Sequence, residues 1–181
     1  MTVSFTTRLP GVIDFRREGV DAAIHVGEEA WPGIAFHRLT SGELVAVAAP
    51  SLIKSLSIRA PKDLRRATLL IHRSRPESWS KWFEAHGLGA VGALPTLAFE
   101  QFTMVFQAAI AGLGVAVAPS FLVQPELTSG ELVSLFEPII EKDQGDFFAY
   151  PVEKKDFAPV VAFREWILKE AAAAKEKRHR H

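Results

Sequence analysis

The sequence places four polar or aromatic residues together at one predicted strand–helix junction: Glu100, Gln101, Phe102 and Thr103. Residues 96–99 are typical of a strand, and the uncharged stretch that follows is typical of a buried helix. In open α/β folds the carboxyl ends of strands face the ligand crevice, and the first turn of a helix offers unpaired N–H groups to a carboxylate or another anion. The alternative is that Gln101 and Thr103 only cap and begin the helix. The sequence leaves both interpretations open.

His25 is a lone imidazole on an otherwise apolar predicted strand, residues 20–26. We favour a satisfied, partly buried histidine at this position over a ligand contact, because histidine commonly packs at intermediate burial. If the ring did reach a ligand, binding would depend on pH near neutrality.

No set of residues in the sequence assembles an active site. The chain has no cysteine, so thiolate nucleophiles, disulfides and Cys-based metal sites are excluded. Residues 87–92 (GLGAVG) match G-x-G-x-x-G, but they follow a predicted helix, and Pro95 prevents another from starting behind them. A dinucleotide site needs a strand before the glycines and a helix after them. We therefore expect no catalytic residue, no cofactor and no metal, and we do not expect an enzyme.

The composition is that of a globular protein without strong charge. The 181 residues include 48% hydrophobic and 23% charged side chains, and 21 basic residues balance 21 acidic ones. A chain that grips DNA by itself usually has a basic excess, which is missing. The start shows no secretory signal pattern, and the most apolar stretch, residues 108–123, is interrupted by glycine and proline. We expect a cytoplasmic chain of one domain or two small lobes that contacts no membrane.

Predicted strands alternate with predicted helices along the chain, which indicates an α/β fold. The dense apolar run at residues 20–26 predicts a strand covered on both faces, as in a parallel sheet. Trp79, Trp82 and Phe83 lie at helical spacing and are expected in the core. The strands are expected at residues 2–7, 20–26, 34–39, 43–48, 69–72, 96–99, 114–118, 132–136 and 146–152.

Six stretches in collinear order resemble the effector domain of LysR-type transcription regulators, in the branch that holds the glycine-cleavage and β-lactamase-inducing regulators. They are residues 6–33, 59–70, 77–88, 99–119, 127–138 and 163–170. The resemblance implies an α/β fold of two Rossmann-like lobes of the type II periplasmic-binding-protein kind. Two crossing strands would join the lobes, with a ligand cleft between them.

The resemblance also suggests boundaries for the two lobes. We expect lobe I in residues 1–47 plus 147–181 and lobe II in residues 48–146. Family members carry a winged helix-turn-helix, a linker helix and a further strand and helix ahead of the point where this sequence starts. The expected fold is therefore N-terminally truncated, and DNA would be contacted only through the missing helix-turn-helix.

Four further binding candidates take support from the resemblance. Thr6 and Thr7 end the first predicted strand, and that end would face the cleft; only one of the two hydroxyls can do so, because neighbours on a strand point to opposite faces. Phe147 lies on the strand that returns to lobe I, close to the expected hinge. His25 stands where this branch often has arginine.

The function implied is that of an effector-binding and dimerisation module that senses a small metabolite, such as a carboxylate, an amino acid or a peptide-like molecule. Dimers would form through helices of opposite lobes, one of which begins near Gln101. The alternative is a periplasmic-type solute-binding protein of the same fold, which would need an export signal that the sequence does not show.

Overall fold

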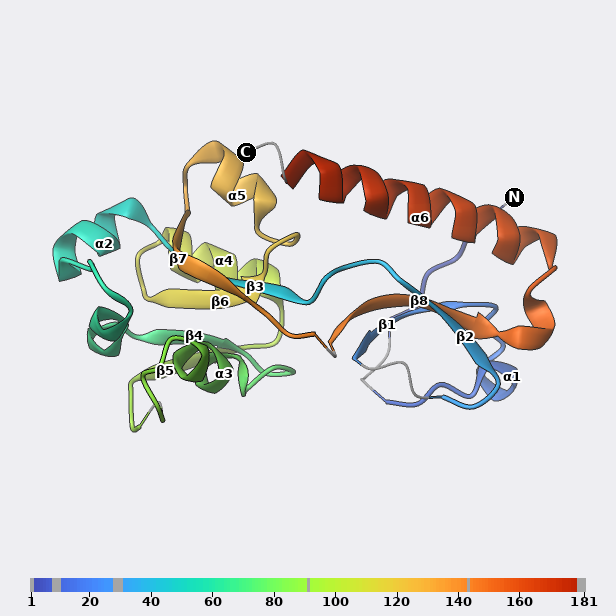
Figure 1. The fold of residues 1–181 in the computed structure, drawn as a ribbon, viewed down its shortest axis with the longest axis horizontal. Coiled ribbons are helices and arrows are strands. Elements are labelled where there is room, and N and C mark those ends of the chain that lie inside the picture. Colours follow the sequence, from blue (N-terminus) through green and yellow to red (C-terminus); the bar gives the residue numbers. More distant parts are fainter. Residues whose placement is uncertain (1, 8–10, 28–30, 91, 143, 179–181) are drawn as a thin grey trace. The chain divides into compact units, whose positions relative to one another are not determined.

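The computed structural model describes residues 2–7, 11–27, 31–90, 92–142 and 144–178. For residues 176–178 it describes the backbone only. The chain forms two compact units. Glu43–Ile140 make up the central unit, and Met1–Gly42 with Glu141–His181 make up the terminal unit. Figure 1 labels the elements of both. None of the described helices is long and apolar enough to cross a membrane.

The central unit is built on a five-stranded sheet in the order β5-β4-β6-β3-β7. β4 is parallel to both of its neighbours, whereas β3 is antiparallel to β6 and β7. β6 is buried throughout because helices cover both faces of the sheet. The strands are β3 (Glu43–Ala48), β4 (Leu69–His72), β5 (Thr96–Phe99), β6 (Val115–Pro119) and β7 (Val133–Ile140).

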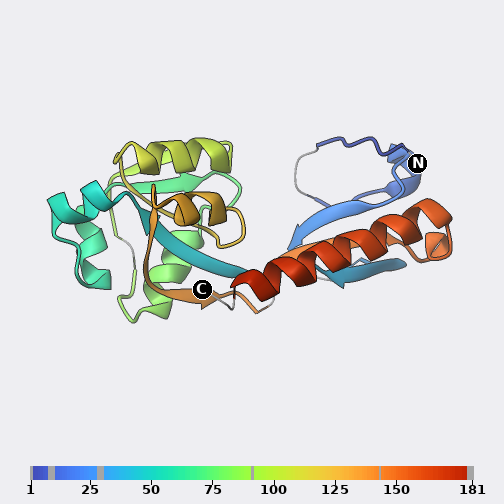
Figure 2. The same cartoon turned by 90° about the horizontal axis from the view of Figure 1, so that it is seen from above.

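Helices lie on both sides of this sheet (Figure 2). Two hydrophobic clusters form between the sheet and these helices. The predicted stripe of Trp79, Trp82 and Phe83 lies fully inside the first cluster. α4 contributes one face to the second cluster. Its other face is open, with Met104 51% exposed, so this uncharged helix is only half buried. The helices are α2 (Pro50–Leu56), η1 (Pro61–Arg66) and α3 (Ser78–Ala85) on the first side, and α4 (Phe102–Ile110) and α5 (Gln124–Ser129) on the second.

The terminal unit has a three-stranded antiparallel sheet in the order β1-β8-β2. The long helix α6 packs on one face, where Val160, Phe163 and Ile167 meet Phe148 and Tyr150 of the central strand. Arg164 also donates to the Tyr150 hydroxyl at 2.8 Å. The elements are α1 (Phe15–Glu18), β1 (Ala23–Gly27), β2 (Ile34–Arg38), β8 (Gly145–Pro151), η2 (Val152–Lys154) and α6 (Ala158–Arg178).

Two predictions for the terminal unit are wrong. Residues 2–7 form no strand and are exposed. β1 is not a covered parallel strand: it pairs with β8 alone, antiparallel, and Ile24 and Val26 remain 54% and 48% exposed. The cause is its position at the sheet edge, since α6 packs over the neighbouring strand β8 instead.

The chain passes from the terminal to the central unit after Gly42 and returns after Ile140. The two passages run side by side, because Glu43 pairs with Ile140 and the Glu141 N–H donates to the Gly42 carbonyl at 3.1 Å. The expected changeovers at residues 47/48 and 146/147 fall inside β3 and β8. The two compact units instead change over at the start of β3 and at the end of β7.

Candidate functional site

The carboxyl ends of β4 and β5 bring together the side chains best placed to bind a ligand in the central unit. The two strands are parallel, with His72 opposite Phe99, so the residues that follow both strands emerge at one edge. Arg73 fixes this edge: its N–H donates to the Phe99 carbonyl at 2.9 Å, and its guanidinium lies 3.2 Å from the Glu100 carboxylate. We call this group the strand-end site; it comprises His72, Arg73, Ser74, Glu100, Gln101, Phe102 and Thr103.

His72 is the last residue of β4 and packs against the start of α4 in the strand-end site. Its ring stacks on Phe102, with centroids 4.2 Å apart and planes 16° apart. Its Nδ1 accepts the Ser74 N–H at 3.2 Å, which places the proton of the neutral ring on Nε2. Burial, followed by the positive charge of Arg75, lowers the pKa of His72 below its ordinary value, while Glu100 acts in the opposite direction. The ring is therefore neutral at neutral pH and holds the start of α4 in place.

The first turn of α4 is open to an anionic group. Gln101 occupies the N-cap position in extended conformation, but its side chain makes no capping hydrogen bond. The first turn holds no acidic residue, and Thr103 is exposed. The first N–H groups of a helix have no carbonyl one full turn back and carry partial positive charge; here the Met104 N–H donates to the Gln101 carbonyl at 3.1 Å instead. The amide of Gln101, the hydroxyl of Thr103 and these N–H groups can together bind a carboxylate.

Arg73 can add a full positive charge to this site. Its partner Glu100 is 70% exposed and Arg73 itself is 64% exposed, so water screens their attraction. Such exposed pairs contribute about 0–1 kcal/mol, and a bound carboxylate can replace Glu100 at little cost.

His25 and Phe147 lie opposite one another on one face of the terminal unit's sheet. The His25 ring packs 4.3 Å from Trp31 and 6.1 Å from Phe36, in agreement with the favoured packing interpretation. Phe147 is fully buried, with the Arg38 guanidinium 4.7 Å above its ring. Neither side chain presents a free polar group comparable with those at the strand-end site.

Thr6 and Thr7 were candidates because they were expected at the end of a strand, and the structure has no strand there. Both are exposed in a segment without regular structure, so no strand end directs their hydroxyls. Among the predicted residues, Gln101, Phe102 and Thr103 are brought together in the central unit, and His25 and Phe147 in the terminal unit.

Sequence reasoning missed His72, Arg73 and Ser74. The signal was present, because His72 ends a short apolar strand and residues 73–74 follow it, just as Glu100 follows the next strand. What the sequence did not reveal is that these two strands are direct parallel neighbours. In the described residues no group of three or more histidine, aspartate or glutamate side chains is placed to hold a metal ion.

Comparison with known proteins gives a consistent result. The model of the LysR substrate binding domain matches residues 3–172. The glycine cleavage system transcriptional activator of Escherichia coli (strain K12) is 32% identical over 186 residues, which cover 96% of this chain and 60% of that protein. The transcriptional activator AmpR of Pseudomonas aeruginosa is 31% identical over 162 residues, 88% of this chain and 53% of that protein.

The fold comparison agrees. The effector domain of AmpR from Pseudomonas aeruginosa matches with a TM-score of 0.77 and 28% identity, over 92% of this chain and 79% of that chain. This confirms the predicted fold class, the type II periplasmic-binding-protein-like α/β fold of LysR effector domains. The chain spans about 60% of the length of the first curated relatives it matches. Since the family model covers most of the chain, the protein belongs to the LysR substrate-binding domain family.

Proposed function

We propose that this chain is the effector-sensing module of a LysR-type transcriptional regulator and that its central unit contacts the effector at the strand-end site. The observation that carries the proposal is the open start of α4: the Gln101 side chain makes no capping hydrogen bond, Thr103 is exposed, and Arg73 lies against Glu100 just before the helix. Relatives that are transcriptional activators support the regulator role. They favour this role over solute transport.

The ligand we propose for this site is a small molecule with a carboxylate, such as an organic acid, an amino acid or a short peptide. A carboxylate matches the helix N–H groups, the Thr103 hydroxyl and the Arg73 guanidinium. The stacked His72 and Phe102 rings add an apolar surface beside these donors.

Regulation requires that the ligand bind one conformational state better than another, because equal binding to both shifts nothing. In the full regulator we propose that this shift reaches DNA through a helix-turn-helix outside this chain. We also propose a cytoplasmic location and self-association as a dimer, as for the family.

A thermal-shift screen of carboxylates, amino acids and short peptides tests the proposal. A ligand at 100 times its dissociation constant stabilises the folded protein by about 2.7 kcal/mol. We expect Thr103→Ala to weaken the binding of any hit about tenfold, because one hydrogen bond to a charged group is lost.

Thr128→Ala, at an exposed threonine on α5, is the matched control and should leave binding unchanged. If neither Thr103→Ala nor Gln101→Ala alters the affinity of a confirmed ligand, the binding site lies away from α4.

A further inference from the structure

β7 is irregular in its middle, shortly before the chain leaves the central unit. On β3, one residue separates Leu44 from Ala46. Their partners on β7, Ile139 and Leu135, are separated by three residues, so β7 carries two extra residues at this point. Extra residues of this kind have no partner in the ladder and bend the strand. We call residues 136–138 the β7 bulge.

Phe136 in the β7 bulge has a left-handed backbone. Its φ is +63°, and in the described part of the chain Ser57 is the only other residue besides glycines with a positive φ. This conformation is strained for a bulky residue. It lets two consecutive side chains, Leu135 and Phe136, pack against the first cluster, whereas neighbours in a regular strand point to opposite faces. Packing therefore holds Phe136 in a conformation that its backbone disfavours.

The Phe136 ring packs against Trp82, with ring centroids 6.1 Å apart. Trp82 is fully buried, yet its Nε1–H has no hydrogen-bond partner among the described residues. Trp79 on the same helix is equally buried, but its indole N–H donates to the Leu70 carbonyl at 3.1 Å. A buried donor without an acceptor costs free energy. Both residues of the Phe136–Trp82 contact therefore carry a cost in this state.

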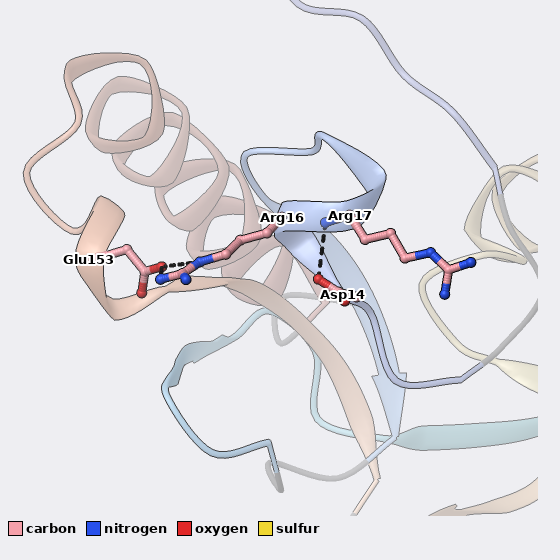
Figure 3. Close-up of polar contacts among 4 residues, drawn as sticks. All are labelled: Asp14, Arg16, Arg17 and Glu153. Atoms are coloured by element: carbon pink, nitrogen blue, oxygen red, sulfur yellow. Dashed lines mark hydrogen bonds and ion pairs between the residues drawn. The ribbon is translucent and has the colours of Figure 1, made fainter.

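The surface of the terminal unit at α1 is better satisfied. Arg16 Nε and Nη2 donate to one Glu153 oxygen at 3.3 and 2.9 Å, and Asp14 accepts the Arg17 N–H at 3.0 Å (Figure 3). These groups are exposed, so water would satisfy them even without a partner. The Trp82 N–H is buried and unpaired, which is more costly.

A straight β7 would have opposite costs and gains. Without the bulge, Glu137 would lie opposite Leu44 in place of Ile139, a shift of two residues. Such a shift keeps the alternation of faces, because side chains on a strand repeat every two residues. Phe136 would leave its left-handed conformation and point away from the first cluster. Glu137 would point toward the cluster, and the cost of burying its carboxylate favours the bulged strand.

We propose that the β7 bulge is a conformational switch: β7 exchanges between the bulged strand and a straight strand in which Phe136 leaves Trp82. β7 ends at Ile140, and the return passage begins at Glu141. In the straight strand the pairing with β3 would end at Pro138, so Ile139 and Ile140 would join the passage. The use of this switch in regulation rests on the proposed function, but the exchange itself takes place in the free chain.

Relaxation-dispersion NMR of the whole ¹⁵N-labelled chain tests the exchange, because it detects minor states of about 1–10% on the μs–ms timescale. The indole N–H groups of Trp82 and Trp79 are matched reporters on one helix. We expect dispersion at the Trp82 indole and at the amides of residues 134–140, and a flat profile at the Trp79 indole. Flat profiles at Trp82 and along β7 would overturn the proposal.

Two substitutions at one position isolate the backbone strain. Phe136→Gly and Phe136→Ala both remove the ring, but only glycine takes a positive φ without penalty. We expect the straight strand to be at least about fivefold more populated in Phe136→Ala than in Phe136→Gly. Ser57→Gly relieves the other positive φ and should leave the exchange in β7 unchanged. Equal populations in the two Phe136 variants would exclude strain as the cause.

Glu137→Val tests the straight register directly. A valine that turns toward the cluster gains burial where glutamate loses hydration, so the straight strand should become about tenfold more populated. Glu131→Val, at an exposed position of the same unit, is the matched control. An unchanged population in Glu137→Val would mean that residue 137 does not change face, which contradicts the proposed straight strand. All three tests use the free chain, so their failure would leave the carboxylate site standing, and a failed ligand screen would leave the switch standing.

Discussion

Each unit of this protein contains histidines packed against aromatic rings, and two of them, His72 and His25, have different surroundings. His72 ends β4 in the central unit and stacks on Phe102 at the start of α4, with Arg73, Gln101 and Thr103 exposed beside it. His25 lies in the middle of β1 in the terminal unit and packs against Trp31 and Phe36.

The difference comes from where each histidine lies on its sheet. At the carboxyl ends of parallel strands the backbone turns into helix starts, whose N–H groups and following side chains remain available to a ligand. On the face of an antiparallel sheet the side chains of neighbouring strands pack against one another, as Phe147 does between Phe36 and Arg38. The first environment suits binding and the second suits stability.

The largest effect expected from this comparison is on stability, at the terminal unit's sheet. Phe147→Ala removes a fully buried ring and should lower the free energy of unfolding by about 3–5 kcal/mol. Denaturation followed by NMR at residues of each unit measures the loss in the terminal unit separately. Phe5→Ala, at a ring 77% exposed, is the control and should cost far less. A loss below about 1 kcal/mol for Phe147→Ala would contradict the packing role.

A smaller effect is expected at the strand-end site. Phe102→Ala removes a half-buried ring that stacks on His72 and Phe106, and should cost about 1–2 kcal/mol. Because the same ring shields His72 from water, its loss should also raise the pKa of His72 toward the ordinary value, as measured by NMR titration. An unchanged His72 pKa would show that Phe102 contributes nothing to its burial.

The comparison also shows how far the sequence predicts this structure. The central unit follows its pattern closely: β5, α4 and β6 lie where the alternation of apolar strand, uncharged helix and apolar strand placed them. Half of its strand-end site could be predicted. Residues 100–103 follow the predicted strand 96–99, and the carboxyl end of a strand in an open α/β sheet faces the ligand crevice. His72 and Arg73 belong there only because β4 neighbours β5, and neighbour order is a tertiary property that local patterns do not carry.

The terminal unit was harder to predict for a related reason. The apolar run at residues 20–26 predicts a strand correctly, but its density says nothing about whether the strand lies inside a sheet or at its edge. Ile24 and Val26 are exposed because β1 is an edge strand, and residues 2–7 form no strand despite their β-rich composition. In both segments tertiary position outweighs local propensity.

The His72 environment predicts a dependence of stability on pH. Its pKa in the folded protein lies below the ordinary value of 6.5, so the unfolded chain binds more protons as the pH falls through that window. The stabilisation by neutral His72 is therefore complete above about pH 6.5 and is lost as the pH falls to the folded-state pKa. His72→Gln should remove this part of the pH dependence in denaturation experiments between pH 5 and 8. A pH profile identical to that of the wild type would exclude His72 as its source.

The smallest expected effect on stability separates binding from folding most cleanly. Glu100→Gln breaks the exposed ion pair with Arg73 and should change the free energy of unfolding by about 0–1 kcal/mol. The same substitution removes the only negative charge among the strand-end site residues, so a carboxylate ligand should bind more tightly, while Arg73→Gln should weaken it. Opposite effects on affinity with little effect on stability are expected only if both side chains face the ligand; parallel changes in stability and affinity would mean that the pair is structural.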